Sequence, residues 1–436
     1  MGKFLLLAFR NVFRNRRRTV MTLLMVGGGV AGLLLVGGFF AFMFRGLRES
    51  TIRTGLGHIQ IFNAEHFRRD EVHVLDTGIS NWRQVAATTQ SAEHVRGVAP
   101  RIEFYGMLSN GVKSGVFMGS AVDPDSERKM GFDPRLASGR DLSTNANGEV
   151  EALVGTGVAR SMSVKVGDGL TILAVTADGA LNGIDVQIVG IVSTGFKDLD
   201  DRYLRITLPS AQRLLQSDRV TNLVVGLDKT ENTDLVAAEI APRLRLASES
   251  MSAAMPRVER TTGNASAGST ANGQTQELTF KKWIELAAYY KQVRTLFSGI
   301  FLFLGIIVFF MVLMASVNTL LMAMFERTRE IGTMLAMGTP RRWIVALFMV
   351  EATLTGILGA AVGVVGGNLL GAALNAVGLH LPAPPGTSFD MLFKVLHVPS
   401  LMVGSSLMVI VSLALASILP AIRASRLQIA EALAHV

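Results

Sequence analysis

The sequence predicts an α+β membrane protein in which four transmembrane helices carry one large mixed α/β domain outside the cytoplasm. The chain of 436 residues is 49% hydrophobic and only 17% charged, with a mean hydropathy of +0.39. A soluble protein normally carries about a quarter charged residues. The apolar residues gather in four long runs, and the roughly 250 residues between the first two runs are enough for a domain with its own core.

Each apolar run is long enough to cross a bilayer, whose hydrocarbon core of about 30 Å needs roughly 20 helical residues. The predicted transmembrane segments are 19–44, 293–325, 343–379 and 399–420. The first is too long for a cleaved signal peptide, and no small-residue cleavage site follows it. All four are therefore interpreted as permanent spans.

Basic residues beside the runs predict the orientation, because Lys and Arg gather on the cytoplasmic side of a membrane. The first run follows a cluster of basic residues without an acid, whereas the loop between the third and fourth runs has only Lys394. Both termini are therefore expected in the cytoplasm. The segments expected there are 1–18, 326–342 and 421–436, and those expected outside are 45–292 and the short loop 380–398.

The external segment alternates apolar and polar residues as strands do. The clearest strand patterns are Val186–Gly195, Arg202–Leu208 and Thr221–Asp228, and helical patterns cover Trp82–Arg96 and Ser210–Gln216. Because strand-like and helix-like periodicities both occur, we predict a mixed α/β domain.

Two further segments have distinctive composition. Residues 1–18 place basic side chains on one helical stripe and apolar ones on the other, which predicts an amphipathic helix on the inner membrane surface held by lipid. The alternative is a plain basic flank. Residues 248–279 are rich in Ser, Thr, Ala, Asn and Gly, and they are predicted to form a flexible insertion.

The apolar runs also suggest how the helices pack. The second run has about 31 residues, or about 46 Å as a helix, which predicts a stalk beyond the membrane. The third run has glycines at strict i,i+4 spacing, which predict close helix packing. These are Gly359, Gly363, Gly367 and Gly371. The packing partner, a helix of this chain or of a second copy, is left open.

Glu351 is the one acidic residue in the third run. A carboxylate in hydrocarbon is costly unless it is paired or reaches the interface. Two interpretations stay open: a functional intramembrane acid, or a side chain that is protonated or extends towards Arg341 or Arg342.

The loop between the second and third spans reads ERTREIGTMLAMGTPRRW. Helix-forming residues run to Gly338, which ends the helix. Ile331, Met334, Leu335 and Gly338 share one face at i, i+3, i+4, i+7 spacing. The chain has no cytoplasmic domain for this face, so we expect it to lie on lipid or to dock into another protein.

This loop resembles the coupling region of the FtsX-like, MacB and lipoprotein-releasing (LolC/LolE) permease family, and the LolC/LolE branch is the closest. Further segments are similar to the family in the expected order. They are AFRNVFRNRRRTVMTLLMV (8–26), VNTLLMAMFERTREIGTMLAMGTPRRWIVALFMVEA (317–352), LPAIRASRLQIAEAL (419–433) and, in the external domain, 122–127, 153–172 and 186–206. Together they cover nearly the whole chain outside 248–279.

The resemblance implies a permease subunit of the bacterial inner membrane, with its large domain in the periplasm. Two ATPase subunits would bind ATP and Mg²⁺ and drive a pair of permeases, either two copies or two paralogues, mainly for lipoprotein release. A periplasmic chaperone or adaptor is a further partner to consider. The alternatives are MacB-like efflux of peptides or amphiphiles and FtsX-like regulation of cell-wall hydrolases. The residues that would contact the ATPase are Arg327, Glu330, Ile331, Met334 and Gly338.

Other functions find little support in the sequence. No G-x-x-x-x-G-K-[ST] motif occurs, so we expect no ATP hydrolysis by this chain, and no G-x-S-x-G motif indicates catalytic residues. His58, His66 and His73 lie at spacings that fit no metal-ligand pattern, so no metal or other cofactor is expected. The chain has no cysteine, and its net charge of +8 is interpreted as a membrane-orientation signal rather than as a sign of nucleic-acid binding.

Overall fold

The protein is described by a computed structural model in two compact units. The described residues are 16–68, 75–132, 134–144, 149–254, 277–382 and 391–428. Unit 1 holds those up to Gly46, those of Gln292–Leu381 and those from Met391 onward, and unit 2 holds those of Leu47–Lys291. The predicted surface helix 1–18 therefore lies outside the described residues, apart from its last three.

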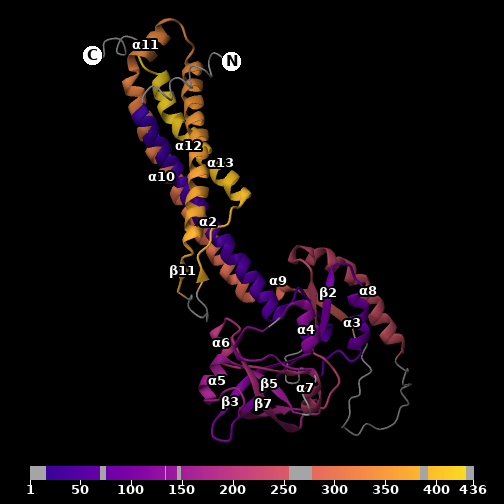
Figure 1. The fold of residues 1–436 in the computed structure, drawn as a ribbon. Helices are drawn as coiled ribbons and strands as arrows, with labels where there is room; N and C mark the ends of the chain where they lie inside the picture. The colour runs from indigo at the N-terminus through magenta and orange to yellow at the C-terminus, as the bar shows by residue number, and fades with distance from the viewer. Residues whose placement is uncertain are drawn as a thin grey trace. The chain divides into compact units, whose positions relative to one another are not determined.

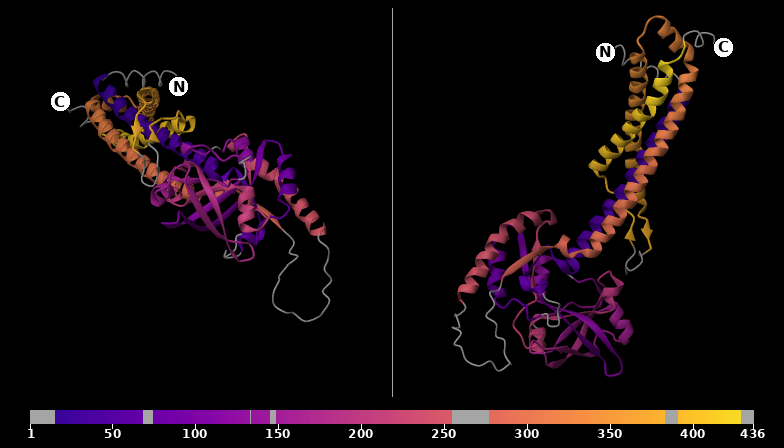
Figure 2. Two further views of the ribbon diagram at one scale, coloured as in Figure 1. Left: turned by 60° about the horizontal axis from the view of Figure 1, so that its bottom comes forward. Right: turned by 180° about the vertical axis from the view of Figure 1, so that it is seen from behind.

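Four helices of unit 1 are long and apolar enough to cross a membrane. They are α2 (Arg16–Thr51), α10 (Ala288–Glu326), α12 (Arg341–Val377) and α13 (Pro399–Ser425). In unit 1, α2 and α10 run side by side (Figures 1 and 2), and the ring centroids of Phe40 and Phe297 are 5.1 Å apart. Each helix corresponds to one predicted apolar run.

Both α2 and α10 are longer than the apolar runs that predicted them. The last residues of α2, from Leu47, and the first residues of α10, up to Lys291, belong to unit 2. Polar residues at these ends, such as Arg48 and Lys291, form helix as readily as the apolar residues, because helix propensity does not depend on hydrophobicity.

Unit 1 also contains three short elements. The helix α11 (Thr328–Ala336) follows α10, and Gly338 after it has a φ of +86°, a left-handed conformation that favours glycine. The strands β11 (His380–Leu381) and β12 (Met391–Leu392) pair within the predicted short loop.

Unit 2 is built on one mixed sheet, in which β6 bridges β2 and β7. The order of the remaining strands along the sheet is β10-β1-β9-β2-β3-β8-β5-β7-β4. The strands are β1 (Ile59–Asn63), β2 (Val95–Ser109), β3 (Ser114–Val122), β4 (Leu136–Gly139), β5 (Glu151–Gly155), β6 (Gly169–Val175), β7 (Leu181–Val192), β8 (Tyr203–Thr207), β9 (Asn222–Leu227) and β10 (Leu278–Lys282). Pairing is parallel between β3 and β8 and between β5 and β7.

Helices cover this sheet, and Figure 1 shows α3 and α8 together beside it. The helices and helical turns are η1 (Ile52–Leu56), η2 (Ala64–Phe67), α3 (Trp82–Gln90), α4 (Pro124–Met130), α5 (Thr156–Met162), α6 (Lys197–Asp200), α7 (Leu208–Leu215), η3 (Thr230–Asn232), α8 (Thr233–Ala254) and α9 (Trp283–Leu286). Alternate strand residues such as Ile102, Phe104 and Phe117 point into the main core, where burial of apolar side chains stabilises the unit.

The predicted elements of unit 2 are found with two corrections. The helix predicted at Trp82–Arg96 ends at Gln90, and β2 begins at Val95, because Val95 and Val98 pair with β9. The predicted range 248–279 overlaps described elements at both ends. Its first residues, up to Ala254, continue α8, and Leu278 begins β10. Residues 255–276 lie outside the described ones.

Candidate functional site

The short helix α11 lies in unit 1 where the ends of three long helices meet. Its apolar face does not project freely: Ile331 is 2% exposed and packs with Met324 of α10, Phe348 of α12 and Ala424 of α13. Met334 and Leu335 pack against the same cluster. The expectation that this face has nothing in its own chain to contact was therefore wrong.

The opposite side of α11 is exposed. Arg329, Glu330 and Thr333 lie on it, and Met337, just past its end, is 78% exposed. Of the five residues predicted to contact an ATPase, Glu330 and Gly338 are exposed, Arg327 and Met334 are half-buried and Ile331 is buried. A partner protein would therefore meet a mainly polar surface with one large apolar side chain.

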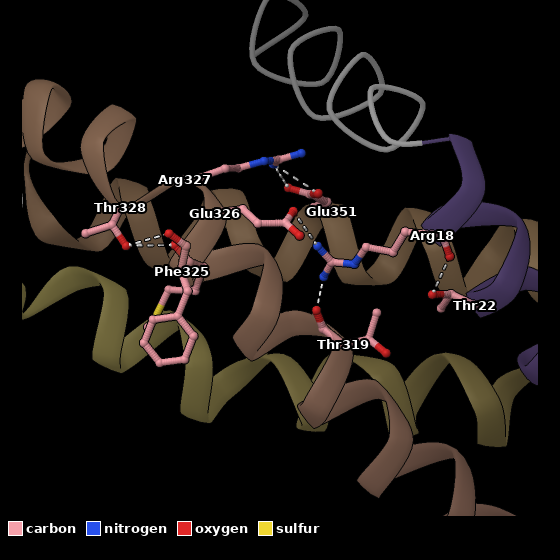
Figure 3. Close-up of polar contacts among 9 residues, drawn as sticks. Arg18, Thr22, Thr319, Phe325, Glu326, Arg327, Thr328 and Glu351 are labelled. Carbon is pink, nitrogen blue, oxygen red and sulfur yellow. Dashed lines mark hydrogen bonds and ion pairs between the residues drawn. The ribbon is translucent and has the colours of Figure 1, made fainter. Parts of the chain in front are cut away.

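Arg327, the residue between α10 and α11, points inward and pairs with Glu351 of α12 (Figure 3). Its Nη1 donates to both carboxylate oxygens, at 3.2 and 3.1 Å, and the two side chains are 15% and 13% exposed. The partner of Glu351 is therefore Arg327 and not Arg341 or Arg342, which are both exposed. The ion pair compensates much of the cost of burying the carboxylate.

A second ion pair lies beside the first. Nη1 of Arg18, on α2, lies 3.5 Å from Oε2 of Glu326, the last residue of α10. Arg18 also donates from Nη2 to the backbone carbonyl of Thr319 (Figure 3). Two arginines and two glutamates thus form a neutral charged cluster, which we call the inner quartet. Arg18, Glu326, Arg327 and Glu351 join α2, α10 and α12 at the start of α11.

A small cavity of about 50 Å³ borders the inner quartet. Polar side chains from α2, α10 and α12 line it, including Thr22, Thr319 and Thr355. Ser316 also lines it, and the buried Ser316 hydroxyl has no hydrogen-bond partner among the described residues. Both ion pairs therefore adjoin a polar space inside the helix bundle.

The glycine ladder of α12 packs on α2 of the same chain. A Cβ atom at Gly359 would lie 2.5 Å from Val26, and one at Gly363 would lie 2.6 Å from the Gly27 carbonyl oxygen. Gly367 faces Ala31 in the same way, and Gly371 faces Leu35 and Val395. Close backbone approach of this kind gains dispersion contacts along the whole seam.

The sequence interpretation missed Arg18 and Glu326. The signal was present: each is a charged residue at the end of a long apolar run, where a side chain can reach a neighbouring helix end. Position along one helix does not show which other helix end lies near, so the pairing itself could not be derived.

Of the three histidines considered as metal ligands, His58 and His66 are described. His73 lies outside the described residues. Within the described ranges, no three His, Asp or Glu side chains are grouped so that they could hold a metal ion. His58 is 7% exposed, and its Nδ1 accepts a hydrogen bond from the Leu227 backbone N–H at 3.0 Å. Burial lowers the pKa of His58 to about 4, because the charged ring would lose its hydration.

Two family models match the chain and together span most of it. The model for the FtsX-like permease C-terminal matches residues 295–429, and the model for the MacB-like periplasmic core domain matches residues 19–243. The chain belongs to this permease family. The second match alone covers more than half of the residues, and it includes α2 and most of unit 2.

Individual relatives agree with the family. The chain is 24% identical to the lipoprotein-releasing system transmembrane protein LolC of Neisseria meningitidis, over 84% of each chain. It is also 24% identical to LolE of Haemophilus influenzae, over 86% of this chain and 84% of the relative. A shorter match, 34% identical over 27% of this chain and 16% of the relative, is to the macrolide export ATP-binding/permease protein MacB of Shewanella oneidensis.

These similarities place the chain among Lol-type and MacB-type ABC transporter permeases. Members of the family are inner-membrane proteins with a periplasmic domain, and they work with an ATPase. The four long apolar helices and the large sheet-based unit fit that class.

Proposed function

We propose that the chain is the permease subunit through which a separate ATPase drives a movement of the periplasmic domain, most directly for lipoprotein release from the inner membrane. Similarity to two lipoprotein-releasing relatives over more than four fifths of the chain supports this substrate class. The shorter match to a macrolide exporter supports efflux as the second candidate.

The observation that carries the proposal is the anchoring of α11. Ile331 ties this helix to α10, α12 and α13, and Arg327 ties its first turn to Glu351. A displacement of α11 therefore cannot remain local, because three helix ends are packed on it. The helix α10 is continuous from Glu326 back to Ala288, and its first residues belong to unit 2.

The complex we infer contains two ATPase subunits, which bind ATP and Mg²⁺, and a second permease that is either a copy of this chain or a paralogue. The exposed apolar side chains of α10 support a lipid or permease contact along this helix. They include Leu296, Leu302, Phe303 and Met314, each more than 60% exposed. A periplasmic chaperone or adaptor would be a further partner of unit 2.

The orientation belongs to the same proposal. Both termini and α11 would lie in the cytoplasm, and unit 2 in the periplasm, as the distribution of basic flanking residues predicts. The ATPase would then contact the exposed side of α11, including Glu330 and Met337. Arg327, Ile331 and Met334 would hold α11 in place rather than contact the partner.

The test is copurification of the full chain from native membranes, with the bound proteins identified by mass spectrometry. Replacing Glu330→Arg together with Met337→Asp is expected to release the ATPase, because both changes lie on the exposed side of α11. Val112→Asp, at a site that is 91% exposed in unit 2, is the matched control and should retain it. An unchanged amount of ATPase in the α11 variant would contradict the docking surface, and a bound acylated protein would favour lipoprotein release over efflux.

A further inference from the structure

Unit 2 contains a cavity of about 650 Å³ that the proposed coupling function does not use. It lies over one face of β2, β3 and β8, on the side opposite to the main core. The register places Glu103, Ser120 and Arg205 in one row across these strands, and Tyr105, Met118 and Tyr203 in the next row. Residues between them, such as Phe104, point into the core. The size is typical of a small-molecule site.

The walls of this cavity are mostly apolar or aromatic. Tyr105, Met118 and Leu199 are exposed to between 39% and 54%, although they lie in a concave surface. Phe196 and Tyr289 close one side, with their rings edge to face at 5.4 Å. The free energy falls when an apolar ligand covers exposed apolar surface of this kind.

Arg205 gives this cavity a buried cation. Its side chain lines the cavity, the residue is 5% exposed, and its Nε has no hydrogen-bond partner among the described residues. The guanidinium lies 5.7 Å from the ring centroid of Tyr203, a cation–π distance. No described carboxylate lies within ion-pair distance of Arg205, whereas the neighbouring Arg101 is paired with Glu127. Glu127 and Asp141 favour the charge of Arg205 from beyond ion-pair distance, but burial still opposes it, and its Nε is left for a ligand to satisfy.

Two acidic side chains also line the cavity, and neither neutralises Arg205 by direct contact. Asp198, the second residue of α6, is exposed. Glu103 is half-buried and lies two strands from Arg205, about 10 Å between Cα atoms at the usual strand spacing. The small Ser120 lies between them, which leaves room for a ligand group beside the guanidinium.

The wall formed by residues 193–200 is held in place by Asp200, which is fully buried. Its carboxylate accepts hydrogen bonds from the Ser193 hydroxyl at 2.7 Å and from the backbone N–H and hydroxyl of Thr194 at 2.6 and 2.8 Å. These bonds fix the loop that presents Phe196 and Leu199 to the cavity. This wall is therefore largely preformed, and binding requires little ordering of it.

We propose that this cavity binds an amphiphile with an anionic head group. The phosphate or carboxylate would lie against Arg205, and the alkyl chain would lie along Tyr105, Met118 and Leu199. A buried cation and a preformed apolar wall in one cavity match these two parts of an amphiphile. The site goes beyond coupling to an ATPase, and its test does not require the ATPase.

The absence of cysteine from the natural sequence gives a direct test. Met118→Cys introduces the chain's single thiol within the cavity, and Val112→Cys introduces one at an exposed position outside it. The full chain is placed in phosphatidylcholine nanodiscs, and the rate of maleimide labelling is measured with dodecyl phosphate below its critical micelle concentration. Dodecyl phosphate is expected to slow labelling at position 118 and leave position 112 unchanged.

Three further arms identify what is recognised. Dodecyltrimethylammonium, with the same chain and opposite charge, should protect position 118 far less, and inorganic phosphate alone should not protect it. In the Met118→Cys chain, Arg205→Met should raise the dodecyl phosphate concentration needed for protection about tenfold or more, and Arg205→Lys should raise it less. Equal protection by the ammonium compound, or protection by inorganic phosphate alone, would overturn the proposal. The first comparison needs no change at Arg205, so it remains decisive if the Arg205 variants fold poorly.

Discussion

Among the described residues, each unit contains one arginine–glutamate pair with both side chains largely shielded from water, and the two pairs are built differently. In unit 2, Arg101 donates from Nε and Nη2 to separate oxygens of Glu127, at 2.7 and 2.8 Å, and the side chains are 3% and 4% exposed. In unit 1, Arg327 uses the single atom Nη1 for both oxygens of Glu351, at 3.2 and 3.1 Å.

The surroundings make the same distinction. Arg101 also donates to the Gly55 carbonyl of η1, so its guanidinium is held on two sides. Arg327 and Glu351 border a polar cavity and lie beside the second ion pair, between Arg18 and Glu326. A two-pronged pair specifies its geometry more strictly than contacts from a single donor atom do. We therefore expect the first pair to contribute more to stability than the second.

Removing the charge of Glu127 is expected to have the largest effect. Glu127→Gln leaves the buried Arg101 without its counter-ion, which should lower the free energy of unfolding of unit 2 by about 3–5 kcal/mol. The measurement is urea unfolding of the full chain in nanodiscs, followed by the fluorescence of Trp82 and Trp283 in a Trp343→Phe background.

Asp125→Asn is the matched control for this change. Asp125 pairs with Arg128 at 2.9 Å on the same helix, α4, but both side chains are about half exposed. The loss should stay below about 1 kcal/mol, because exposed ion pairs contribute little. If the two variants were equally stable, the Arg101–Glu127 pair would not have the structural role assigned to it.

The glycine seam tests how tightly α12 packs on α2 in unit 1. Gly363→Leu would force a side chain into the Gly27 carbonyl and the Cβ of Val30, both 2.6 Å from the added Cβ, so unit 1 should lose about 3 kcal/mol. Gly366→Leu, three residues along, meets nothing within 4 Å at its Cβ and should change stability little. SDS-induced unfolding followed by circular dichroism compares the two, and equal losses would show that α12 is not packed tightly on α2.

These sites also show what local sequence can predict. The strict spacing of the four glycines predicted a close approach, because a helix face follows from i,i+4 periodicity. The identity of the partner, α2, depends on how helices distant in the chain come together. For the same reason, the apolar face of Ile331 was visible in the sequence, but its burial against Phe348 and Ala424 was not.

The sequence predicted the cavity in unit 2 even less well than it predicted these packing partners. Arg205 occurs in a stretch whose strand character was clear from the sequence, as in RYLRITL. It becomes unusual only because β8 lies beside β3, far from it in the sequence, and because η1 and α9 enclose that face. Strand order is a non-local property, so no local pattern indicated a buried cation there.

The Arg327–Glu351 pair should tolerate an exchange of its two charges. Glu351→Gln removes one charge of the inner quartet, and unit 1 should lose about 2 kcal/mol, less than a fully buried pair because water reaches this one. Exchanging the charges in Arg327→Glu/Glu351→Arg should recover most of that stability in SDS-induced unfolding. It should not restore ATP hydrolysis by the complex to the same extent, because Arg18 and Glu326 are matched to the original arrangement. A double variant no more stable than the single one would contradict direct pairing.

The smallest expected effect is a loss of stability of unit 2 as the pH falls, which leaves the contacts of α11 unchanged. The pKa of His58 is about 4 in the folded protein and near 6.5 when the chain unfolds, so the unfolded state takes up a proton first as the pH falls. The stabilising effect of the neutral ring is complete above pH 6.5 and is lost towards pH 4. Between pH 7 and pH 5.5 the expected loss is about 1 kcal/mol.

His58→Asn shows whether this residue is responsible. The Asn side-chain oxygen can accept the Leu227 N–H that His58 Nδ1 accepts, but it does not titrate in this range. Urea unfolding of the Trp343→Phe chain at pH 7 and pH 5.5 should therefore show a smaller loss in the Asn variant. If its loss equals that of the parent chain, the pH dependence of unit 2 arises elsewhere. If SDS-induced unfolding of unit 1 shows the same loss of stability between pH 7 and pH 5.5, the two units do not respond to pH independently.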